Sequence, residues 1–134
     1  VLDGVTDREA SFSPASGEWN AKQVLAHLIH SDRGFLANIA DLVGGYERNA
    51  DDFGGNSTTH LNATIAAYGS MEAMLQELNY LADEIVEFLA ALPPEFVSWK
   101  SNYRDLGTGF LYVTHAESHV EQIRNAINAA RKAG

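Results

Sequence analysis

Apolar residues recur every three or four positions along three long stretches of this chain, and this period is typical of packed helices rather than of a sheet. The first stretch starts at Asn20, a good N-cap residue, and runs to Val43, before two glycines. The second runs from Thr58 to Leu92, where two prolines end it, and the third from Thr108 to Lys132. We therefore predict an all-α bundle in antiparallel, up-and-down order, with no sheet.

The chain is short enough for a single domain over residues 1–134 with one core. Residues 1–19 have the pattern of a helix end, a short acidic turn and a loop. The chain begins with Val1 where that helix would already be ending, so we expect it to be N-terminally incomplete. Residues 95–107 are predicted to form an irregular connection with one short turn.

Charge and composition narrow the possible partners. The net charge of −9 repels phosphate backbones and anionic lipids, so we expect neither a nucleic acid nor a membrane as partner. No apolar run of about 18 residues predicts a transmembrane helix, and the start lacks the pattern of a signal peptide. Cysteine is absent, which is compatible with a cytoplasmic location and restricts any metal ligands to His, Asp or Glu.

Two histidines stand inside the apolar stripe of the last predicted helix. His115 and His119 are four residues apart, so they lie about 40° from each other around the helix axis. Imidazoles at buried positions need polar partners, and a metal ion would satisfy both at once. Hydrogen bonds to carboxylates or water are the alternative, and the sequence alone leaves the two interpretations about equal.

A third ligand would have to come from another helix. His27 lies at the edge of the apolar stripe of the first predicted helix, so it can face the bundle interior, whereas His30 is expected to point to solvent. His60, near the start of the second helix, is expected to be solvated. Three histidines with an open position are typical of catalytic metal sites. Asp32 is read as a residue beside the ligands or at the surface, and Gln122 as a hydrogen-bond partner of a ligand histidine or a bridge between helices.

Two segments together resemble the signatures of the DinB/YfiT-like superfamily. "GEWNAKQVLAHLIHSD" has the tryptophan, the helix with "HL" and the acidic residue five positions after the histidine. "THAESHVEQI" resembles the second signature, a His-x3-His followed by Gln-Ile. The resemblance covers nearly the whole chain, and the matching positions are Trp19, His27, Asp32, His115, His119, Gln122 and Ile123.

The resemblance implies a four-helix bundle, often a homodimer, that holds zinc or nickel through His27, His115 and His119. The first helix of that bundle would precede "LDGVTDREA" and is largely missing here, although it carries none of the ligands. Characterised members include transferases and isomerases that use a low-molecular-weight thiol such as bacillithiol, mycothiol or glutathione.

We therefore expect a metal-dependent enzyme with a three-histidine site that acts on a small-molecule substrate, most simply as a thiol S-transferase. In that case the loop between Gly44 and Gly55 would border the substrate pocket. One alternative is a metal-dependent hydrolase. The other is a bundle, with or without metal, that acts in interaction or stress response without catalysis.

Overall fold

The computed structural model describes residues 1–46, 55–98 and 110–134. Every regular element in these ranges is helical, which confirms the all-α prediction. The elements in chain order are α1 (Asp7–Ala10), α2 (Ala21–Val43), α3 (Thr58–Tyr68), α4 (Met71–Ala90), the 3-10 helix η1 (Pro94–Ser98) and α6 (Phe110–Ala133). The one short turn expected after the two prolines is η1.

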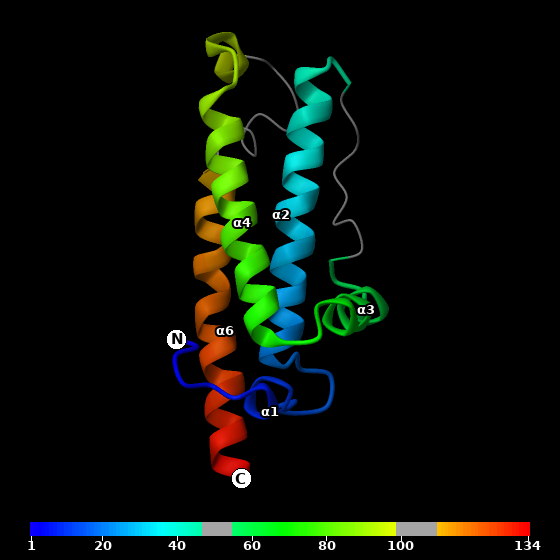
Figure 1. Cartoon of the computed structure of the whole chain (residues 1–134), viewed down its shortest axis with the longest axis vertical. Coiled ribbons are helices and arrows are strands. Elements are labelled where there is room, and N and C mark those ends of the chain that lie inside the picture. Colours follow the sequence, from blue (N-terminus) through cyan, green and yellow to red (C-terminus); the bar gives the residue numbers. More distant parts are fainter. Residues whose placement is uncertain (47–54, 99–109) are drawn as a thin grey trace.

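The three long helices α2, α4 and α6 lie side by side along the long axis of the molecule (Figure 1). α2 and α4 run in the same direction and α6 runs opposite to both, so the direction of α4 differs from a simple up-and-down order. The reason is the length of the segment that joins α2 to α3. Residues 44–57 can span about 46 Å when extended, and α2 is only about 34 Å long. The chain can therefore return to the start of α2 before α4 begins.

The structure confirms Asn20 as the N-cap of α2. The Asn20 side chain accepts a hydrogen bond from the backbone N–H of Gln23, and the Gln23 side chain accepts one from the backbone N–H of Asn20. This capping box satisfies two backbone donors that the first turn of a helix leaves unpaired. It fixes where α2 begins, and with it the position of His27 two turns later.

The predicted single helix from Thr58 to Leu92 is wrong, because the chain breaks at Gly69 and Ser70. Gly69 has a φ of +76°, which a residue without a side chain adopts without strain. Ser70 then acts as the N-cap of α4 and accepts a hydrogen bond from the backbone N–H of Ala73 at 3.1 Å. α3 consequently lies beside the first half of α2 and is seen end-on in Figure 1, whereas α4 lies along the axis.

α1 is a single helical turn within the segment for which a helix end, a short acidic turn and a loop were predicted. The Asp7 carboxylate accepts a hydrogen bond from the backbone N–H of Met71 at 2.9 Å and pairs with Lys22 at 2.9 Å. These two contacts lower the pKa of Asp7, the bond from Met71 more than the bond from Lys22. One carboxylate therefore connects α1 to the starts of both α2 and α4.

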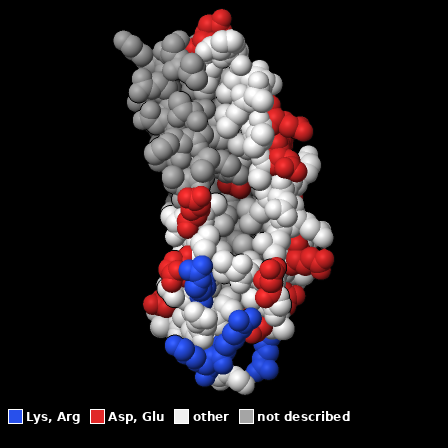
Figure 2. All heavy atoms as spheres, turned by 90° about the vertical axis from the view of Figure 1, so that its left-hand side faces the viewer, with Lys and Arg blue, Asp and Glu red and all other residues white. Residues whose placement is uncertain are grey.

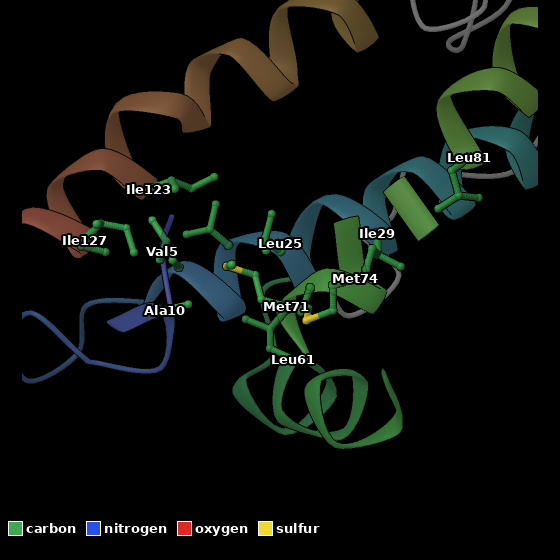
Figure 3. Packing of buried hydrophobic residues seen from close by; sticks show 14 residues of the cluster. Val5, Ala10, Leu25, Ile29, Leu61, Met71, Met74, Leu81, Ile123 and Ile127 are labelled. Atoms are coloured by element: carbon green, nitrogen blue, oxygen red, sulfur yellow. The ribbon is translucent and has the colours of Figure 1, made fainter. Parts of the chain in front are cut away.

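The main core lies where α2, α4 and α6 meet α1 and α3. Figure 3 shows Leu25 and Ile29 of α2 among side chains from α4 and α6, with Leu61 of α3 closing the core from one side. A second cluster of buried side chains fills the other end of the bundle, between α2, α4 and η1, and consists of Phe35, Ile39, Leu42, Ile85 and Phe96. Two clusters along one helix hold α2 as the central rod of the fold.

Positive charge gathers at one end of the molecule. In Figure 2, Lys and Arg side chains lie at the end that carries α1 and the last turns of α6, while Asp and Glu are spread over the rest of the visible face. At the starts of α2 and α1 and the end of α6, the buried Lys22 pairs with Asp7 and Arg131 pairs with Glu9, each at 2.9 Å. The remaining surface on this face carries the acidic excess.

Candidate metal centre

His27 of α2 and His115 and His119 of α6 meet at one point between the two helices. The Nε2 atom of His115 lies 3.1 Å from Nε2 of His27 and 3.2 Å from Nε2 of His119. A ligand atom from each of the three residues lies within 4.8 Å of the other two. The four-residue spacing places both α6 histidines on one face, and the packing of α2 on α6 brings the third.

The outer nitrogens of two of these rings are held by hydrogen bonds. Nδ1–H of His27 donates to the backbone carbonyl of Gly55 at 2.9 Å, and Nδ1–H of His119 donates to Oε1 of Gln122 at 2.8 Å. A neutral imidazole that donates from Nδ1 presents a lone pair at Nε2. His27 and His119 therefore both direct Nε2 lone pairs at the centre of the group.

This arrangement suits a cation better than a hydrogen-bonded histidine cluster. Nε2–H of His115 can donate to one of these two lone pairs but not to both, which leaves the other lone pair without a donor from His115. Two nitrogen ligands of a tetrahedral ion with bonds of 2.0–2.1 Å lie about 3.3 Å apart. The observed 3.1 and 3.2 Å are close to that separation, so the three-histidine group fits a metal-binding site.

The electrostatics of the group point the same way. Burial lowers the pKa of His115, and the neighbouring His119 and His27 lower it further. His115 is thereby kept neutral, the form in which imidazole binds a metal. His27 itself is buried, with 8% of its surface exposed, while the two α6 histidines are half-buried. The site is thus closed on the side of α2 and more open on the side of α6.

Trp19 closes one side of the site and borders a cleft. Its ring centroid lies 5.2 Å from that of His27, and it also packs against the main core. A cleft of about 660 Å³ begins beside it and reaches His119. The described residues that line this cleft are Pro14, Gly17, Glu18, Trp19, His119, Gln122, Asn125 and Ala126. A small molecule in the cleft would lie against a candidate ligand and the amide that orients it.

Asp32 and Gln122, the two residues predicted to lie near the ligands, differ in their contacts. Asp32 is buried with 6% of its surface exposed, so the surface alternative for it is wrong, and burial raises its pKa to about 7. Among the described residues, none makes a hydrogen bond or ion pair with it. Gln122 contacts His119, as one of its two interpretations predicted.

His30 and His60 lie outside the three-histidine group. His60 is exposed, as expected. The expected orientation of His30 toward solvent is wrong, because its Nε2 lies 2.8 Å from Oγ1 of Thr64 and its ring stacks on that of His60 with centroids 6.0 Å apart. α3 covers this position, which the pattern of α2 alone could not reveal. Burial by α3 is also the main cause that lowers the pKa of His30.

One contributor to the site was missed by reasoning from the sequence. The carbonyl of Gly55 orients His27, but a backbone acceptor leaves no signal in residue type. Asn38, eleven residues after His27 on α2, is also buried, and its Oδ1 has no hydrogen-bond partner among the described residues. Most of the loop between Gly44 and Gly55, which was expected to border the substrate pocket, lies outside the described residues.

One comparison with known proteins, the match to a family model, agrees with this geometry. None of the helices in the described ranges combines the length and apolarity that crossing a membrane requires. No curated protein and no solved structure matches the chain. The family model of the DinB superfamily matches residues 1–123, which include all three histidines and Gln122. The match covers most of the chain, so this protein belongs to the DinB superfamily.

Proposed function

We propose that this protein is a metal-dependent enzyme that transfers a low-molecular-weight thiol to an electrophilic small molecule. The observation that carries the proposal is the pair of fixed lone pairs at Nε2 of His27 and His119, directed at Nε2 of His115. Three nitrogen ligands leave room for one exchangeable ligand. The cleft beside His119 offers space for the rest of a substrate.

Each residue has a separate task in this proposal. His27, His115 and His119 would hold zinc or nickel, which when bound would favour the ionised form of a thiol at neutral pH. Gly55 and Gln122 keep the two flanking imidazoles in the correct tautomer. Trp19 shields His27 from water. In the reaction a sulfur–carbon bond forms, a leaving group departs from that carbon with its electron pair, and the thiol proton goes to solvent.

Elemental analysis of the untagged protein and a thiol-consumption assay with a simple electrophile test this proposal. We expect zinc or nickel to copurify with the wild type, and His119→Ala to lose both the metal and the activity, because two ligands hold a divalent ion poorly against water. His60→Ala is the matched control, since it removes an exposed histidine outside the group.

The fold should survive in His119→Ala, because the main core is apolar and independent of the site. We expect a circular dichroism spectrum near that of the wild type and a lower Tm in the presence of metal. Retained thiol transfer by metal-free His119→Ala would falsify the catalytic role, and complete unfolding of the variant would show that the site is structural.

A further inference from the structure

The cleft beside His119 has an uneven charge. Of the described residues that line it, Glu18 is the sole Asp, Glu, Lys or Arg. Its carboxylate forms no hydrogen bond or ion pair with any described residue. Two carboxamides, Gln122 and Asn125, supply the other polar groups beside the histidine. Among the described residues, a ligand in the cleft therefore meets one negative charge with no positive charge beside it, together with neutral hydrogen-bonding groups.

The backbone of Glu18 is held close to the three histidines by its neighbours in the chain. The backbone N–H of Glu18 donates to the carbonyl of Ala15 at 3.2 Å, which closes a turn. The next residue, Trp19, is anchored on the core and lies against His27. The carboxylate is exposed, but it extends from a backbone that the turn and the tryptophan hold next to the three histidines.

We infer that the cleft selects among thiols by charge and that Glu18 sets this preference. The inference rests on the proposed thiol-dependent function and specifies its co-substrate: a thiol with a positively charged amine near the sulfur binds better than one with a carboxylate there. The field of one exposed carboxylate extends about 8 Å at physiological salt. A screened, exposed charge pair changes affinity by about twofold to fivefold.

Three small thiols of similar size test the inference on protein loaded with Co²⁺. Cysteamine carries an ammonium group, 2-mercaptoethanol is neutral and 3-mercaptopropionate carries a carboxylate. Binding of each thiol is followed through the sulfur-to-cobalt absorption band, so the readout does not depend on turnover. Each thiol is compared between wild type and Glu18→Gln, so that differences in the acidity of the thiols themselves cancel.

We expect Glu18→Gln to weaken cysteamine binding by about twofold to fivefold and to strengthen 3-mercaptopropionate binding by a similar factor, with 2-mercaptoethanol unchanged. Glu18→Lys should invert the preference, and 1 M salt should reduce every difference. Glu117→Gln is the matched control, because Glu117 is an exposed glutamate of α6 that does not line the cleft. It should leave all three affinities as they are.

The outcomes separate this inference from the function on which it rests. Bands with all three thiols whose affinities are the same in wild type and Glu18→Gln would overturn the charge selection and leave the thiol-dependent function standing. The same shift in Glu117→Gln as in Glu18→Gln would also overturn it, since the effect would then come from net charge. No band with any thiol in the wild type would overturn the proposed function and the inference together.

Discussion

Asp32 offers a quantitative test of how the fold is held together. Burial raises the pKa of its carboxyl from 3.8 to about 7, and no described residue bonds it. A carboxyl whose pKa is higher in the folded than in the unfolded state binds more protons when folded. The folded state is therefore favoured at low pH and loses stability as the pH rises from 3.8 toward 7.

The size of the effect follows from the pKa difference. Between the two pKa values the loss is about 1.4 kcal/mol per pH unit, or about 2.5 kcal/mol between pH 5 and pH 7. Asp32→Asn removes the ionisation while keeping the shape of the side chain. We expect the variant to be more stable than wild type at pH 7, and the difference in free energy of unfolding to shrink by about 2.5 kcal/mol at pH 5.

Urea denaturation of the metal-free protein at a series of pH values measures this difference directly. Asp3→Asn is the matched control, because Asp3 is exposed and loses the same charge. Wild type and the variants carry the same histidines, so any contribution from these residues cancels in the comparison. A constant stability difference between Asp32→Asn and wild type from pH 5 to pH 7 would refute the argument from burial, and so would an equal change in Asp3→Asn.

Three further predictions concern the candidate metal centre and helix α3. Gln122→Ala should lower metal affinity by about tenfold to a hundredfold, measured by chelator competition, with Asn125→Ala as control; unchanged affinity would mean that Gln122 does not orient His119. Gly69→Ala should cost about 1 kcal/mol in urea denaturation, because the added Cβ meets open space and the cost is only the left-handed φ; no loss would contradict the break between α3 and α4. Leu61→Ala should cost about 2–4 kcal/mol by the same measurement, because Leu61 is fully buried; a loss below about 1 kcal/mol would show that α3 is not anchored there.

The parts of the fold that the sequence predicted are those that depend on local spacing. The N-cap at Asn20 and the same-face position of His115 and His119 follow from residues only a few positions apart. His27 was predicted because it is at the edge of an apolar stripe, which also depends on helical period alone. The convergence of all three histidines then required only that α2 pack against α6.

The features that sequence reasoning missed depend on contacts between distant segments or on a weak local signal. The burial of His30 depends on α3, which is docked by residues more than 30 positions away. The break at Gly69 had a local signal, a glycine followed by an N-capping serine, but the apolar stripe on either side concealed it. The direction of α4 depends on where Gly55 and α3 lie relative to α2, which a pattern of residue types does not encode.

The hydrogen bond from His27 to the carbonyl of Gly55 links the metal centre to a segment just before α3. α3 is itself docked on α2 through Gln23 to Asn62 and through His30 and Thr64. The orientation of a ligand histidine and the docking of α3 thus belong to one thermodynamic cycle. If the three histidines hold a metal, loosening α3 is expected to weaken its binding, and the bound metal would make the opening of α3 less favourable by the same free energy.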